Sequence, residues 1–103
     1  MSINLTTEDF YDTIAATPGT SVVQFTATWC VPCRQLTPRL EEVTNELDVK
    51  YYKVDVDENS DLAIEFQIMS VPTLQYYKDG KLVDVSVGTQ NKPQLRERFS
   101  KLS

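Results

Sequence analysis

VVQFTATWCVPC, at residues 22–33, holds the strongest structural signal in the chain and its only two cysteines. Its first four residues are apolar except for Gln24, as expected of a strand that helices cover on both faces of a sheet. After Cys33, apolar residues recur at helical spacing, at Leu36, Leu40, Val43 and Leu47. The pattern predicts a strand that leads into an amphipathic helix, with the cysteines where the helix begins.

The segments before and after residues 22–47 also predict strands that alternate with helices. A short edge strand is expected over residues 3–5, followed by a helix over 7–16 that Thr6 and Asp9 begin in the manner of a capping box. A strand over 52–56 and a short helix over 60–66, capped by Ser60, form a second strand-helix unit.

The C-terminal third predicts a hairpin and a last helix. Strands over 74–78 and 81–87 flank Asp79-Gly80, a dipeptide that suits a tight turn. Asn91 caps the helix, whose buried face carries Leu95, Phe99 and Leu102. The order β-α-β-α-β-α-β-β-α predicts the α/β class, with one central mixed β-sheet and α-helices on both faces.

Length and composition limit the classes of function. The 103 residues are expected to form one domain, residues 1–103, with the 41% hydrophobic content of a globular protein. We expect a cytoplasmic protein, unless a targeting segment was removed, because no apolar run reaches membrane-spanning length and no signal peptide begins the chain. The net charge of -5 and the lack of a basic block argue against nucleic acid as a partner, and no membrane partner is expected.

The two cysteines must carry any chemistry, because the chain has no histidine. This composition excludes a four-ligand zinc site within one chain and a Cys-His nucleophile, so no metal site is expected. Three residues apart at a helix start, the cysteines should lie about 5 to 6 Å apart, a separation that fits a disulfide. A purely structural disulfide is a weak alternative, because a four-residue loop gains under about 2 kcal/mol.

The positions of the two thiols predict different roles. The helix N-terminus favours a thiolate at Cys30 and can lower its pKa by at most about 1.5 units. We therefore expect Cys30 to be an exposed nucleophile. Cys33, shielded one turn further along, is expected to attack the mixed disulfide that Cys30 forms and to release the reduced substrate.

Two motifs resemble those of the thioredoxin family. Trp29-Cys30-Val31-Pro32-Cys33 is similar to the family's W-C-x-P-C site, and Val71-Pro72-Thr73 to its cis-proline loop. Asp79-Gly80 and Gly88 match as well, so the resemblance covers nearly the whole chain. It implies a thioredoxin fold and a protein-disulfide reductase that needs no bound cofactor, that thioredoxin reductase keeps reduced, and that acts on disulfide-containing substrate proteins. A monomer is expected.

The resemblance also implies roles for residues around the cysteines. Pro72 should be cis and face the two sulfurs, and the Val71 backbone should be free to pair with an extended substrate segment. Trp29, Val71, Pro72 and Gly88 would together form a shallow apolar surface for substrate proteins. Taken alone, Trp29 and Val71 would be read as core residues, Pro72 as a trans turn residue and Gly88 as an end-of-strand turn.

The chain departs from the family pattern near the site. Gln24 stands where thioredoxins usually carry a buried Asp, while Lys53 matches the Lys that accompanies it; Val31 replaces the common Gly before Pro32. An amide exchanges no proton near neutral pH, so the family's proton acceptor for Cys33 is missing. Residues 24, 31, 32 and 53 are candidates for tuning the thiols, but a purely structural role for Gln24 and neutral variation at Val31 remain open.

Two further functions stay open at this stage. The substitutions at Gln24 and Val31 are compatible with a specialised or more oxidising relative that uses the same chemistry. The fold is also compatible with a module that docks partners and does not use its thiols.

Overall fold

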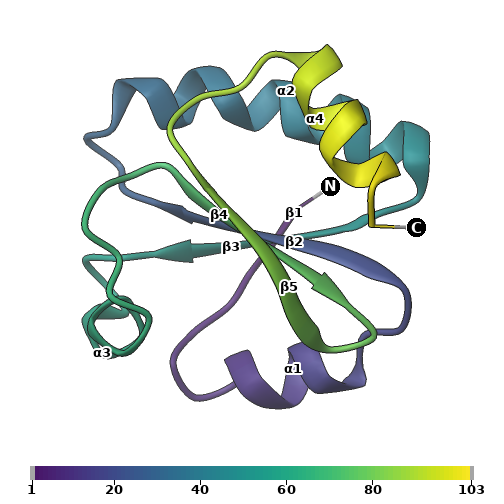
Figure 1. Cartoon of the computed structure of the whole chain (residues 1–103). Coiled ribbons are helices and arrows are strands. Elements are labelled where there is room, and N and C mark those ends of the chain that lie inside the picture. Colours follow the sequence, from purple (N-terminus) through teal and green to yellow (C-terminus); the bar gives the residue numbers. More distant parts are fainter. Residues whose placement is uncertain (1, 103) are drawn as a thin grey trace.

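The computed structural model describes residues 2–102, and its elements follow the predicted order (Figure 1). They are β1 Ser2–Asn4, α1 Phe10–Ala16, β2 Thr20–Thr26, α2 Val31–Leu47, β3 Lys50–Asp55, α3 Ser60–Glu65, β4 Thr73–Lys78, β5 Lys81–Val87 and α4 Lys92–Ser100. No helix among these residues is long and apolar enough to cross a membrane.

A single mixed sheet forms the centre of the molecule, with the strand order β1-β3-β2-β4-β5. β1, β3 and β2 run parallel, β4 is antiparallel to β2, and β5 is antiparallel to β4. β2 lies in the middle, and its residues Val22, Val23 and Phe25 are fully buried. The apolar run that predicted a strand covered on both faces is explained by this position.

Helices cover both faces of the sheet, as predicted. α2 and α4 lie on one side and α1 and α3 on the other (Figure 1). Leu36 and Leu40 of α2 and Leu95 of α4 share a buried cluster with Val22. Successive residues of a strand point to opposite faces, so Val23 belongs to the other cluster, with α1 and α3. Gln24 therefore points toward α2, the helix that carries the cysteines.

The hairpin between β4 and β5 turns at the predicted dipeptide. Asp79 and Gly80 both have positive φ angles, of 50° and 82°. A Cβ atom at position 80 would lie 3.2 Å from the backbone of Ala15, so close packing against α1 adds a second reason for glycine there.

Two predicted helix starts were wrong, and one hydrogen bond joins the two regions. α1 begins at Phe10 and not at Thr7; residues 7–9 form turns, and the Thr7 N-H donates to Asn59 Oδ1 at 2.9 Å. The N-cap of α3 is Asn59 and not Ser60, which is the first helical residue. This contact joins two segments 52 positions apart, which local patterns do not report.

Candidate active site

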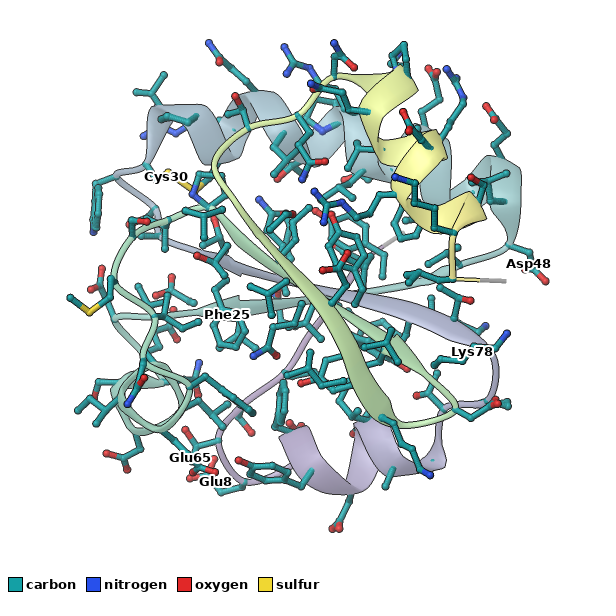
Figure 2. All side chains as sticks on the ribbon, viewed as in Figure 1. Glu8, Phe25, Cys30, Asp48, Glu65 and Lys78 are labelled. Atoms are coloured by element: carbon teal, nitrogen blue, oxygen red, sulfur yellow. A yellow bond between two sulfur atoms is a disulfide. The ribbon has the colours of Figure 1, made fainter. Side chains whose placement is uncertain are left out.

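The two cysteines lie at the junction of β2 and α2. Cys30 is the N-cap of α2 and the helix begins at Val31, so both cysteines lie at the start of the helix, as predicted. The two cysteines form a disulfide with a Cα-Cα distance of 5.3 Å, within the predicted range. Figure 2 shows this disulfide at the first turn of α2, near the label for Cys30. Pro32 fits the first turn because a residue there needs no intrahelical N-H donor.

Exposure does not separate the two cysteines, contrary to our expectation for Cys30. Cys30 is 3% and Cys33 1% exposed in the disulfide form, because both pack with Ala27 against Val56 and Val71. Their hydrogen bonding does differ. Cys30 Sγ accepts the backbone N-H of Cys33 at 3.2 Å, so the sulfur of Cys30 is the one that meets the N-terminal end of the helix.

Trp29 lies on the surface and not in the core. Its side chain is 64% exposed, and its indole Nε1 donates to Asp57 Oδ2 at 2.9 Å. This contact ties the residue before Cys30 to the loop after β3. Val31, on the other side of Cys30, is 55% exposed. Asp57 was not predicted as part of this region, because its contact with Trp29 depends on the fold.

The Val71-Pro72 loop meets the cysteines, although it follows them by about forty residues in sequence. The Val71-Pro72 peptide bond is cis, as predicted. Val71 packs against the cluster that contains both cysteines, and Pro72 O accepts the N-H of Gly88 at 2.9 Å. Gly88 has a φ of 92°, which favours glycine. The fold therefore brings Val71, Pro72 and Gly88 together near the cysteines, but Pro72 itself is buried and not on the surface as expected. That Pro72 faces the two sulfurs stays a prediction.

A buried polar network lies beneath Cys33. Gln24 is fully buried, and its Nε2 donates to Cys33 O at 3.4 Å. Thr37 Oγ1 donates to the same carbonyl at 3.0 Å, and the Tyr51 hydroxyl donates to Gln24 Oε1. Burial raises the pKa of the Tyr51 hydroxyl well above its ordinary value. Neither Thr37 nor Tyr51 was predicted from the sequence, although Thr37 follows Cys33 by one helical turn.

Lys53 lies beside this network. It pairs with Gln24 in the register of β3 and β2 and is half-buried. Together with Cys33, Thr37 and Asp55 it lines a cleft of about 480 Å³. The cleft places the polar and charged side chains of Thr37, Lys53 and Asp55 beside Cys33.

Trp29 offers an optical test of the site. Reduction of the Cys30-Cys33 disulfide is expected to increase the emission of Trp29, the only tryptophan, because a neighbouring disulfide quenches indole fluorescence. Emission spectra before and after dithiothreitol measure the effect. A spectrum that reduction leaves unchanged would show that the exposed indole points away from the sulfurs.

Comparison with known proteins supports the resemblance that the motifs indicated. The family model described as Thioredoxin matches residues 1–101. A thioredoxin of Staphylococcus saprophyticus is 44% identical over 101 residues, which cover 96% of this chain and 95% of that protein. A thioredoxin of Staphylococcus aureus is 41% identical over the same coverage. A solved structure of a mutant thioredoxin from Halobacterium salinarum superposes with a TM-score of 0.90 at 30% identity, over 98% of this chain and 89% of the other.

Proposed function

Because the chain belongs to the thioredoxin family and is a thiol-disulfide oxidoreductase with a Cys30-Cys33 redox pair, we propose that Cys30 attacks the disulfides of substrate proteins and Cys33 resolves the product. One observation carries this assignment: Cys30 is the N-cap of α2, and its sulfur accepts an N-H of the helix. A hydrogen bond and the positive end of the helix both stabilise a thiolate on that atom.

The reaction proceeds in two exchanges. The Cys30 thiolate attacks one sulfur of a substrate disulfide, and the substrate's other sulfur leaves as a thiolate. Cys33 then loses its proton and attacks the Cys30 sulfur of the mixed disulfide. The Cys30-Cys33 bond forms, the second substrate thiol leaves, and two electrons have passed from the protein to its substrate.

The surface around the pair supports recognition of extended peptide segments. The exposed Trp29 and the half-buried Val71 and Gly88 would contribute a shallow apolar surface beside the disulfide, with the buried Pro72 supporting it from below. Strand-like pairing with the Val71 backbone would hold the segment on either side of the substrate cysteine, while the apolar surface accepts its side chains. Such recognition depends mainly on the backbone, so it suits many different substrate proteins.

The cycle needs a source of electrons. Thioredoxin reductase is the partner that family membership implies, and it would return the Cys30-Cys33 disulfide to the dithiol. A dithiol reductase works where the surroundings keep thiols reduced, so the cytoplasm is the compartment that fits this activity. We expect the monomer to be the working form.

Reduction of insulin disulfides tests the proposal. The dithiol form is expected to reduce insulin, and a variant with both Cys30→Ser and Cys33→Ser is expected to be inactive with its fold unchanged. Equal insulin reduction by the two proteins would contradict the proposal. A wild-type protein that reduces no insulin, while it and the double-serine variant bind partner proteins equally, would favour the docking module.

A redox titration against glutathione separates a general reductase from a more oxidising relative. About 30 mV corresponds to a tenfold change in the equilibrium constant of a two-electron couple. A potential near that of the reducing thioredoxins, roughly -270 mV, is expected for a general reductase. A value above about -200 mV would favour the specialised alternative that Gln24 and Val31 left open.

A further inference from the structure

The amide of Gln24 is held from two sides. Its oxygen accepts the Tyr51 hydroxyl from β3, and its nitrogen donates to Cys33 O in the first turn of α2. Both Gln24 and Tyr51 are buried, with exposed fractions of 0% and 3%. The amide therefore links the sheet to the backbone of the second cysteine through hydrogen bonds that water does not reach.

Of the two hydroxyls near Gln24, that of Tyr51 fixes the amide. Thr37 Oγ1 lies 3.0 Å from Cys33 O and 3.3 Å from Gln24 Oε1. This hydroxyl has one proton, so it donates to one of the two acceptors at a time. When Thr37 donates to the Cys33 carbonyl, Tyr51 is the donor that remains for Gln24 Oε1. This donor decides which end of the amide points to Cys33, because a flipped amide would set its nitrogen against the Tyr51 donor.

We propose that Tyr51 is a positioning residue for the resolving cysteine, acting through the Gln24 amide on the backbone of Cys33. The inference rests on the proposed function, in which Cys33 attacks the mixed disulfide at Cys30. The backbone N-H of Cys33 also donates to Cys30 Sγ at 3.2 Å. A fixed Cys33 backbone therefore positions both the attacking thiol of Cys33 and the Cys30 sulfur that it attacks. An attack of this kind depends steeply on the distance and direction between the reacting atoms.

The network itself carries no charge near neutral pH. Burial raises the Tyr51 pKa, so the hydroxyl keeps its proton and remains a donor. The charged groups around it come from two elements and a loop: Glu41 of α2 lies near Tyr51, and Arg34, Lys53, Asp55 and Glu58 line the cleft beside Cys33. Tyr51 therefore acts by geometry, and its loss should leave the pH dependence of the resolving step unchanged.

A coloured nitrobenzoate disulfide separates the two exchanges in one stopped-flow trace. Attack by Cys30 releases a first equivalent of the coloured thiolate, and attack by Cys33 releases a second. Tyr51→Phe is expected to slow the second phase by about fivefold, the effect of one net hydrogen bond, and to leave the first phase nearly unchanged. The reduction in the second phase is expected to be the same factor at each pH from 6 to 8.

Tyr52→Phe is the matched control. Tyr52 is also a buried tyrosine of β3, with a hydroxyl 2.7 Å from Thr17 Oγ1, but it belongs to the opposite cluster, with α1 and α3. Its loss also removes a buried hydrogen bond, yet the second phase is expected to keep the wild-type rate. Equal slowing by both variants would mean that lost stability, and not positioning, lowers the rate.

Further variants complete the test. In a Gln24→Leu background, Tyr51→Phe should slow the second phase no further, because the amide that transmits its effect is absent. If Tyr51→Phe does not fold, Thr37→Val removes the hydroxyl that donates to Cys33 O beside the Gln24 amide, and it should slow the second phase alone. An unchanged second phase in Tyr51→Phe or Thr37→Val, further slowing by Tyr51→Phe in the Gln24→Leu background, or a changed pH slope overturns the inference. Absence of both phases in the wild type would overturn the proposed function instead.

Discussion

Cys30→Ser is expected to abolish turnover, whereas Cys33→Ser is expected to trap covalent mixed disulfides with substrate proteins. The first variant has no nucleophile at the helix N-terminus, where Cys30 Sγ accepts the Cys33 N-H. The second retains that nucleophile but has no thiol to resolve the adduct. Because both cysteines are nearly fully buried, this difference in roles rests on the helix end and not on exposure.

Insulin turnover and mass spectrometry under non-reducing conditions measure the two outcomes. Turnover should fall to the background rate in both variants, and an adduct should accumulate only in Cys33→Ser. The variant with both serines is the control for non-specific attachment. Equal trapping by the two single variants would refute the assignment of Cys30 as nucleophile and Cys33 as resolving residue.

Local chemistry was enough to predict most of the fold. The apolar run around Gln24 predicted the central strand because β2 is covered on both faces. Asp79-Gly80 predicted the hairpin, because few other dipeptides adopt two positive φ angles. Asn91 predicted the start of α4, where its side chain and that of Gln94 complete a capping box. In each case one or two adjacent residues determine the local backbone.

Features that depend on distant contacts were missed. α1 begins three residues later than predicted, and the contact between Thr7 and Asn59 beside its start joins segments that no local pattern relates. The alternating valines of residues 81–87 predicted a strand, but not that Val85 and Val87 would be exposed, at 46% and 66%. β5 is the edge of the sheet, and edge position depends on the order of all five strands.

The same distinction holds for the residues of the candidate site. The cysteines and the Val71-Pro72 loop were predicted because each is a short motif. The link from Tyr51 through Gln24 to Cys33 was not, because it joins β3, β2 and α2. Tyr51 lay just before the strand predicted over residues 52–56, in phase with its polar residues Lys53 and Asp55, so the pattern did not single it out. Only the register of β2 against β3 brings its hydroxyl to Gln24.

Gln24→Asp is expected to accelerate the resolving step and to destabilise the fold. Gln24 occupies the position of the family's acid and points toward α2, where Cys33 O lies 3.4 Å from its Nε2. Aspartate is one methylene shorter, so its carboxylate would reach Cys33 across a bridging water. A base whose pKa lies near the working pH contributes roughly 100-fold or more when well placed, and about tenfold is expected across such a water near pH 7.

Stability should change in the opposite direction. The new carboxyl would be as buried as Gln24, which is fully buried, so its folded-state pKa would rise by roughly 3 units from the unfolded value near 3.9. Below pH 3.9 both states hold the proton, and the extra cost is small. As pH rises between the two pKa values, the unfolded chain binds fewer protons than the folded protein, so the free energy of unfolding falls; it levels off above the folded pKa.

The expected cost is about 1.5 kcal/mol at pH 5 and about 4 kcal/mol at pH 8, relative to wild type at the same pH. Hydrogen bonds from Tyr51 to the carboxylate, and any ion pair with Lys53, its register partner, would reduce both the pKa shift and the cost. Urea midpoints of variant and wild type at the two pH values measure the stability, and the second phase of the nitrobenzoate trace measures the rate.

Gln24→Glu is the matched control, because it keeps the length of the native side chain while adding a carboxylate. A Gln24→Asp protein that equals wild type in both measurements would show that Gln24 is a structural residue. Faster resolution together with a pH-dependent loss of stability would show the opposite: with Gln24 in place of an acid, the network beneath Cys33 lacks a proton acceptor but gives a more stable fold.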